Sequence, residues 1–180
     1  SPGSSTEVLA NRILEAAGLD PKKGVSPQYL SVSEAAGAMK DGKLDAFFWI
    51  GGLPTAAITD LVTTASAKKL RFLPTDAALA KLKAKYGPVY GELKLAKTVY
   101  RLEADVPGIS VGNVIAVNAG MPEKLAQDLL KTLFDNLDEV RKVHPEAASL
   151  ALGAAATGAS IPFHPGATAF FREKGVWPAK

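Results

Sequence analysis

The sequence predicts an α/β fold, and three observations support that prediction. Short apolar runs typical of strands alternate along the chain with segments whose apolar residues recur at helical spacing. The chain has 180 residues, of which 47% are hydrophobic and 22% charged, so it can bury a core and is not expected to be disordered. The strongest strand candidate is apolar almost throughout, which favours a largely parallel sheet covered by helices on both faces.

The composition also excludes several classes of protein and site. The 21 basic and 18 acidic residues give a net charge of +3 without a basic run, so nucleic acid is a poor default partner. The absence of cysteine excludes disulfides, thiolate metal sites and a cysteine nucleophile. His144 and His164 each precede a proline with no further ligand type beside them, so neither a metal site nor another cofactor is expected. No apolar stretch approaches the ~18 residues that cross a bilayer, so no direct membrane insertion is expected.

The first helix is expected to begin at Ser4 to Glu7 and to end before Gly18. Ser4 and Glu7 have the spacing of a capping box, in which a hydroxyl and a carboxylate each accept a hydrogen bond from a backbone N–H. A short strand is then predicted at 29–32. A second helix, capped by Ser31 or Ser33, is predicted to follow and to end at Asp41-Gly42.

The residues from Leu44 to Ile50 are the strongest strand candidate of the chain. A glycine turn follows them, and a helix is predicted from Ala56 to about Ala65 with Ile58, Leu61 and Val62 facing inward. A further strand is predicted at 70–73, and a helix capped by Thr75 or Asp76 is predicted to run through Tyr86.

The second half is expected to hold one strand and several helices. Residues 87–108 are predicted to be irregular, because glycines and prolines punctuate them, and a strand is predicted at 109–118. The longest helix is expected from Pro122 to about Val143, with its inward face formed by Leu125, Leu129, Leu133, Leu137 and Val140. His144-Pro145 is predicted to end that helix. A final helix is predicted at 167–174, with His164 and Gly166 in structural roles in the turn before it.

Two turns that lead into helices are the candidate functional positions. At the first, Ser4, Ser5 and Thr6 offer hydroxyls and free backbone N–H groups at a helix N-terminus, where partial positive charge favours a carboxylate or a phosphate. Simple N-capping is the alternative interpretation, because one hydroxyl is enough for a cap.

The second candidate is the turn that follows the strongest strand prediction. Ligands of parallel α/β sheets lie beyond the carboxyl ends of strands, and glycines there let the backbone approach a ligand closely. We therefore single out Trp49 as a wall and Gly51, Gly52, Pro54 and Thr55 as the turn. The alternative is a tight turn with Phe48 or Trp49 in the core. The turn lacks the Walker lysine and the GxGxxG spacing of nucleotide sites, and the chain has neither a GxSxG nor an HExxH motif, so nothing in it indicates an enzyme.

Six segments carry motifs that occur together in one known family: Pro2 to Glu7, Asp45 to Ile58, Asp105-Val106-Pro107, Val114 to Val117, Leu133 to Asn136 and Ile161 to Ala167. The most specific block is Asp-Ala-Phe-Phe followed by Gly-Gly-x-Pro-Thr. In the same order and over essentially the whole chain, these motifs resemble those of the TAXI family of TRAP-transporter solute-binding proteins. The chain departs from the family at Ser5, where a glycine is usual, and at Tyr100-Arg101-Leu102, where Tyr-Pro-Gly is usual.

The resemblance implies a type II periplasmic-binding-protein fold with one complete lobe and part of a second, because the family's upstream lobe is not among these residues. Residues 1–75 are expected to form the ligand-binding lobe, 76–108 a crossover, and 109–180 a return strand with helices at the hinge or on the other lobe. The implied function is periplasmic capture, without catalysis, of a small anionic solute such as glutamate or another amino or organic acid, and delivery to a TRAP membrane permease. The implied ligand-binding residues are those of the two turns.

Two other functions remain open at this stage. One is an α/β enzyme that acts on a small carboxylate, although the sequence supplies no evident pair of base and nucleophile. The other is a sensory module in which ligand closure drives a partner protein instead of a permease.

Overall fold

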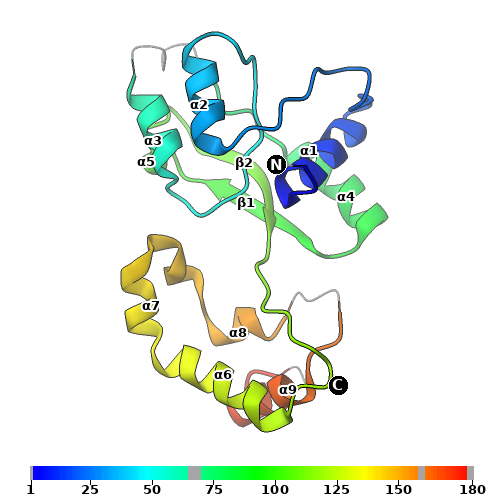
Figure 1. The fold of residues 1–180 in the computed structure, drawn as a ribbon, viewed down its shortest axis with the longest axis vertical. Helices are drawn as coiled ribbons and strands as arrows, with labels where there is room; N and C mark the ends of the chain where they lie inside the picture. Colours follow the sequence, from blue (N-terminus) through cyan, green and yellow to red (C-terminus); the bar gives the residue numbers. More distant parts are fainter. Residues whose placement is uncertain (1, 65–69, 158–160, 178–180) are drawn as a thin grey trace. The chain divides into compact units, whose positions relative to one another are not determined.

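The computed structural model describes residues 2–64, 70–157 and 161–177, which form two compact units, Ser1–Ser110 and Val111–Lys180 (Figure 1). Helices predominate and a small sheet is present, so the predicted α/β class is confirmed. Residues 76–108, expected to form a crossover, belong to the first unit. The assignment of 1–75 as the ligand-binding lobe stays a prediction.

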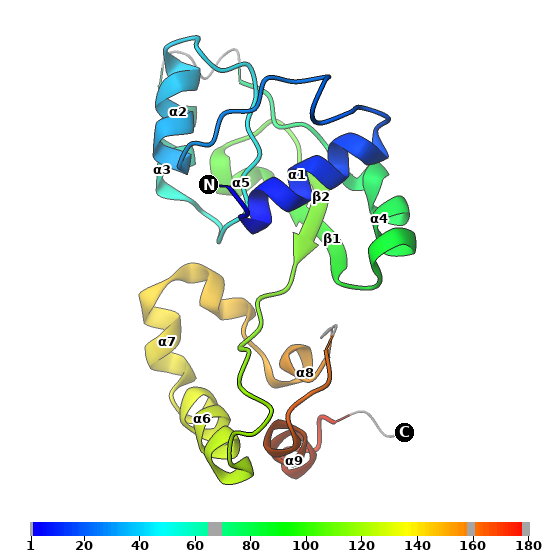
Figure 2. The same ribbon diagram turned by 45° about the vertical axis from the view of Figure 1, so that its right-hand side comes forward.

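The first unit contains the sheet and most of the helices whose starts are marked in the sequence by a capping residue. Its elements are α1 (Ser5–Ala16), α2 (Val32–Lys40), α3 (Ala56–Thr63), the 3-10 helix η2 (Asp76–Ala78), α4 (Leu79–Tyr86), β1 (Tyr90–Leu95), α5 (Lys97–Tyr100) and β2 (Val106–Val111). Helix α2 lies against α3, and α1 lies against α4 (Figures 1 and 2).

The two strands of the sheet run antiparallel. A side chain at Gly91 would meet Ser110, whereas one at Gly108 would meet Leu93, so the paired positions advance in opposite directions. The hydroxyl of Ser110 also donates to the carbonyl of Glu92 at 3.1 Å, in the same register. The prediction of a largely parallel sheet is therefore wrong for the described residues, whose sheet contains β1 and β2.

The predicted helix starts are confirmed where a capping residue marks them. The hydroxyl of Ser4 accepts the N–H of Glu7 at 3.2 Å, and the Glu7 carboxylate accepts the N–H of Gly3. In α2, Ser31 rather than Ser33 is the cap, and its capping box with Glu34 is complete. These bonds are local along the chain, which is why sequence spacing alone predicts them.

The predicted strands at 29–32, 44–50 and 70–73 are wrong, because no described residue of these segments is in a strand. Apolar character makes a segment fit for a sheet, but only hydrogen bonding to a neighbour makes it a strand, and these segments have no ladder partner among the described residues. Conversely, 87–108 is not irregular, since β1 and α5 lie inside it. The strand predicted at 109–118 begins earlier and ends at Val111.

The core of the first unit joins helices and strands that are distant in sequence. Ile58, Leu95 and Tyr100 are buried together, and Val32, Leu53, Val62, Phe72, Val99, Leu102 and Val106 pack against them. Rings of Phe72 and Tyr100 stack at 5.6 Å. Between α1 and α4, the guanidinium of Arg12 lies 3.7 Å from the centre of the Tyr86 ring and donates to the hydroxyl of Tyr90.

The second unit is helical in its described part. It contains α6 (Glu123–Asp135), α7 (Leu137–Val143), the 3-10 helix η3 (Pro145–Ser149), α8 (Leu152–Ala155) and α9 (Pro165–Glu173). The single long helix predicted from Pro122 to Val143 is thus two helices, with Pro122 as the cap of α6 rather than its first residue. They meet at Asn136, whose backbone leaves the helical region and whose side-chain amide donates to the carbonyl of Thr132. His144 follows the last residue of α7, as predicted.

The buried face of α6 is not the one predicted. Leu125 and Leu129 are 48% and 49% exposed, whereas Ala126 is buried and Leu130 and Phe134 pack against the core of the second unit. That core consists of Ala156, Phe170 and Phe171 with their neighbours. Helix α6 therefore presents the adjacent stripe to α9, because two apolar stripes one residue apart are equally periodic in the sequence.

Helix α9 lies against α6 (Figures 1 and 2), and Gly166 is a point of close approach between them. A Cβ atom there would lie 2.2 Å from the carbonyl oxygen of Glu123. Next to it, Nδ1 of His164 accepts the N–H of Gly166 at 3.1 Å, and Nε2 donates to the carbonyl of Met121 at 3.0 Å. The His164 ring is hydrogen-bonded to backbone groups, and Gly166 leaves room for the backbone of α6. These contacts are in line with the structural roles predicted for both residues.

Candidate functional site

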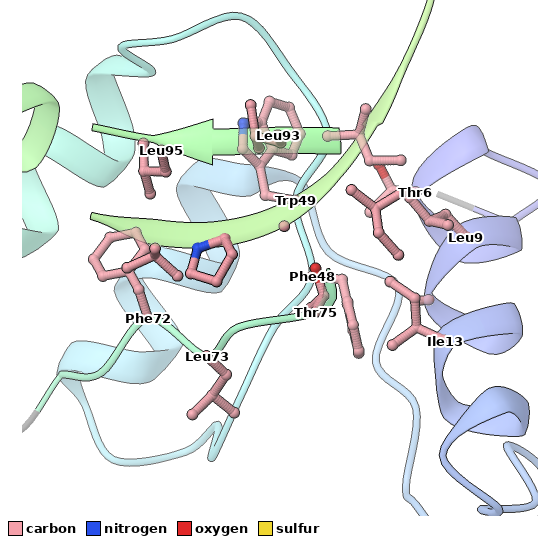
Figure 3. Close-up of a pocket in the computed structure, with 16 residues that line it drawn as sticks. Thr6, Leu9, Ile13, Phe48, Trp49, Phe72, Leu73, Thr75, Leu93 and Leu95 are labelled. Atoms are coloured by element: carbon pink, nitrogen blue, oxygen red, sulfur yellow. The ribbon is translucent and has the colours of Figure 1, made fainter. Parts of the chain in front are cut away.

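The first unit contains a pocket of about 150 Å³ between α1 and the sheet (Figure 3). Four segments of the chain supply its walls, and all of them belong to the same unit. The lining residues are Thr6, Leu9, Ala10 and Ile13 of α1; Phe48, Trp49 and Ile50; Phe72, Leu73 and Thr75; and Leu93, Leu95, Val106, Pro107, Gly108 and Ile109 of the strands.

Helix α1 forms one wall with residues spaced by helical turns. Thr6, Leu9 and Ile13 follow one another at three and four residues, so they project from the same face of the helix (Figure 3). Leu9 is buried, and Thr6 and Ile13 are half-buried. Helical spacing from Leu9 and Ile13 therefore places Thr6, in the first turn of α1, at the pocket.

Strand β1 contributes to the opposite wall through the alternation of its side chains, and β2 contributes four consecutive residues. Leu93 and Leu95 line the pocket, whereas Lys94 between them pairs with Asp105, with 2.8 Å between Nζ and Oδ2. Successive side chains of a strand point to opposite faces, which separates these two environments. Sequence reasoning missed this wall because the segment was interpreted as irregular, although its alternation of apolar and polar residues was a usable signal.

Trp49 is held in place by the turn that follows it. The indole Nε1 donates to Oγ1 of Thr55 at 2.9 Å, and the Thr55 hydroxyl donates in turn to the carbonyl of Gly52 at 2.8 Å. A Cβ atom on Gly51 would lie 2.7 Å from the Trp49 ring, so a side chain there would displace the indole. Trp49 and Phe48 are each 38% exposed, so the alternative that they are core residues does not describe them.

The structure brings the two candidate turns together only in part. Thr6 and Trp49 line the same pocket, whereas the lining does not include Ser4, Ser5, Gly51, Gly52, Pro54 or Thr55. The hydroxyl of Ser4 forms the cap of α1, and the hydroxyl of Thr55 takes part in the hydrogen bonds described above. The backbone N–H of Thr55 donates a hydrogen bond to the hydroxyl of Tyr100 at 2.8 Å. The hydrogen bonds of the turn 51–55 therefore hold Trp49 in place, and the turn itself lies outside the lining of this pocket.

The electrostatic character of the pocket is close to neutral. Of the described residues that line it, none is charged, and Thr6 and Thr75 bear its side-chain hydroxyls. The partial positive charge comes from the first turn of α1, where the N–H groups of Ser5 and Thr6 have no acceptor within the helix. The arrangement suits the binding of a small molecule and holds no pair of base and nucleophile.

Metal and membrane signals are missing from the part of the chain that the structure describes. No cluster of three His, Cys, Asp or Glu side chains is placed there to bind a metal ion. Within the same residues, none of the helices has both the length and the apolar character needed to span a membrane.

Comparison with known families gives a match that covers nearly the whole chain. A family model described as the NMT1-like family matches residues 1–175, so the chain belongs to that family. This is a family of periplasmic-binding-protein type, whose members bind a small-molecule ligand rather than catalyse a reaction and are typically extracytoplasmic. The family thus agrees with a pocket whose lining suits the binding of a small molecule.

Proposed function

We propose that this NMT1-like protein is the periplasmic solute-binding component of a TRAP transporter of the TAXI type. It captures a small carboxylate, such as glutamate or another amino or organic acid, and delivers it to the membrane permease. The single observation that carries the proposal is the position of Thr6, which lies in the first turn of α1 and also lines the pocket. Sequence resemblance supplies the transporter type.

The carboxylate is assigned to the first turn of α1. The first four N–H groups of a helix have no partner within it, and the aligned peptide dipoles favour an anion there. Ser4 already satisfies the N–H of Glu7, so the remaining donors are the N–H groups of Ser5 and Thr6 and their hydroxyls. The Glu7 carboxylate accepts a hydrogen bond from the backbone N–H of Gly3. Its negative charge therefore lies beside the residues that precede the helix.

The test is a double substitution, Ser5→Ala with Thr6→Ala, in the full-length protein. A hydrogen bond to a charged group contributes about 1.5–3 kcal/mol, so losing the equivalent of one such bond should weaken binding of the carboxylate by roughly 10- to 100-fold. The free energy of unfolding should fall by about 1 kcal/mol or less, because Ser4 still caps the helix. Isothermal titration calorimetry measures the affinity and urea unfolding the stability.

The matched control is Ser33→Ala with Thr98→Ala, which removes the same two hydroxyl types from exposed helix positions of the same unit. The control should bind like the unchanged protein. Equal affinity in the Ser5/Thr6 variant would contradict the assigned position of the carboxylate. Chemical conversion of the solute during the titration would favour the enzyme alternative. Solute binding that supports no uptake through a permease but changes the activity of a partner protein would favour a sensory module.

A further inference from the structure

We infer that the pocket holds the apolar tail of the solute, so that the protein selects monocarboxylates with a branched or aromatic tail over dicarboxylates such as glutamate. This inference rests on the proposed function for the position of the carboxylate at the start of α1. It narrows the proposed class of small carboxylates to those with an apolar tail, and it therefore places glutamate outside that class.

The first argument is the chemistry of the walls. Aliphatic and aromatic side chains from α1, the 48–50 segment and both strands make up almost all of the described lining. The one indole N–H among them is already donated to Thr55. A second carboxylate placed against these walls would lose part of its water without finding a cation among the lining residues, and burying an unpaired charge is unfavourable.

The second argument is that the basic side chains Arg12 of α1 and Lys94 of β1 are engaged away from the pocket lining. Arg12 belongs to α1, but its guanidinium lies over the Tyr86 ring and donates to Tyr90, away from the pocket lining. Lys94 belongs to β1, but it pairs with Asp105 on the other face of the strand. Both elements therefore present hydrocarbon to the pocket and keep their charges elsewhere.

The third argument is the size of the space. The pocket measures about 150 Å³. A cavity of about that volume lined by Leu, Ile and Phe stays dry and binds benzene in another protein, so a phenyl or a branched alkyl group fits here. Thr6 and Ile13 are separated by about 10 Å along the helix, at ~1.5 Å per residue, so one short molecule can reach from the helix start into the pocket.

The experiment uses calorimetry on the full-length protein with four carboxylates: phenylacetate, 4-methylpentanoate, acetate and glutamate. Benzyl alcohol is the neutral probe of the pocket. We expect phenylacetate and 4-methylpentanoate to bind at least about tenfold more tightly than acetate and glutamate, because the buried apolar tail adds favourable transfer free energy.

The decisive variant is Ala10→Leu, which fills the pocket from a helical position with a residue that favours helices. It should weaken phenylacetate and 4-methylpentanoate by about tenfold or more while leaving acetate within about twofold. The control is Val8→Leu, two residues earlier on α1, at an exposed position outside the lining. It should leave all four affinities within about twofold.

A second variant keeps the inference testable if the Ala10→Leu protein folds poorly. Thr75→Val removes a lining hydroxyl at nearly constant volume, and the Thr75 side chain makes no cap bond to η2. Phenylacetate should bind this variant as tightly as the unchanged protein or more tightly. A tenfold loss instead would show that the pocket recognises a polar group, and the inference would be overturned.

The remaining outcomes separate this inference from the proposed function. Tightest binding of glutamate, unaffected by Ala10→Leu, would overturn the inference and leave the proposed function standing. Binding of benzyl alcohol that Ala10→Leu abolishes, with no carboxylate bound, would support the apolar pocket and contradict the proposed function. A lower melting temperature of Ala10→Leu with every affinity unchanged would show that the pocket is covered by protein, which also overturns the inference.

Discussion

The backbone N–H of Thr55 donates a 2.8 Å hydrogen bond to the hydroxyl of Tyr100, which lies 45 residues further along the chain. Tyr100 is only 3% exposed, and its ring stacks on Phe72 in the core of the first unit. This bond connects the turn 51–55, which positions Trp49, to the core of the first unit. A residue from a segment that sequence patterning marks as irregular thus positions one wall of the candidate site.

Replacing Tyr100 by phenylalanine should lower the free energy of unfolding by about 1–3 kcal/mol, because the half-buried N–H of Thr55 loses its acceptor. The aromatic packing on Phe72 is kept, which isolates the hydroxyl. Urea unfolding measures the change. Tyr29→Phe, at a position 53% exposed, is the matched control and should change stability by no more than about 0.5 kcal/mol. Equal stability of the two variants would contradict the structural role of the bond.

Replacing Gly166 by alanine should destabilise the second unit by about 1–3 kcal/mol or more, because the added methyl group overlaps backbone of α6. The new Cβ would lie 2.2 Å from the carbonyl oxygen of Glu123 and 2.9 Å from Cβ of Ala126, so α9 would have to move away. Thermal unfolding followed by circular dichroism measures the loss. Gly153→Ala adds the same methyl group within α8, where nothing lies within 4 Å, and should be neutral or stabilising by up to about 1 kcal/mol.

Stability of the first unit should depend on pH through Asp105. The hydrogen bond from Lys94, and then that from the backbone N–H of Lys97, lower the pKa of Asp105 below its ordinary value. A carboxyl group with a lowered folded pKa stabilises the fold above its unfolded pKa of about 3.9, and that contribution is lost as the pH falls through the folded pKa. Asp105→Asn should therefore be less stable at about pH 7, and the difference should shrink towards pH 2.

Urea midpoints at several pH values test this expectation. The effect should be small because the pair is on the surface, and ~1 M salt should reduce it. A stability difference between the two proteins that stays constant from neutral to acid pH would show that the charge of Asp105 does not contribute. A difference that grows towards acid pH would have the wrong sign for a lowered pKa.

Local signals account for the parts of the fold that the sequence predicts well. Ser4 with Glu7 and Ser31 with Glu34 mark helix starts because the bonds of a cap join residues three apart or nearly so. Ile58 and Leu61 are buried on α3, as helical spacing predicts. The break at His144 also follows from the chain itself, since proline cannot continue a helix.

The sequence by itself determined the helix starts that Ser4 and Ser31 cap and the helix end at His144, and it placed Thr6 at an N-terminus suited to an anion. Only the tertiary structure decided which segments pair as strands, which stripe of α6 is buried, and that Thr6 and Trp49 line one apolar pocket with Leu93 and Leu95. The reason is that caps and turns depend on neighbours a few residues away, whereas strand pairing and pocket walls depend on partners tens of residues away, and no local periodicity specifies which partner that is.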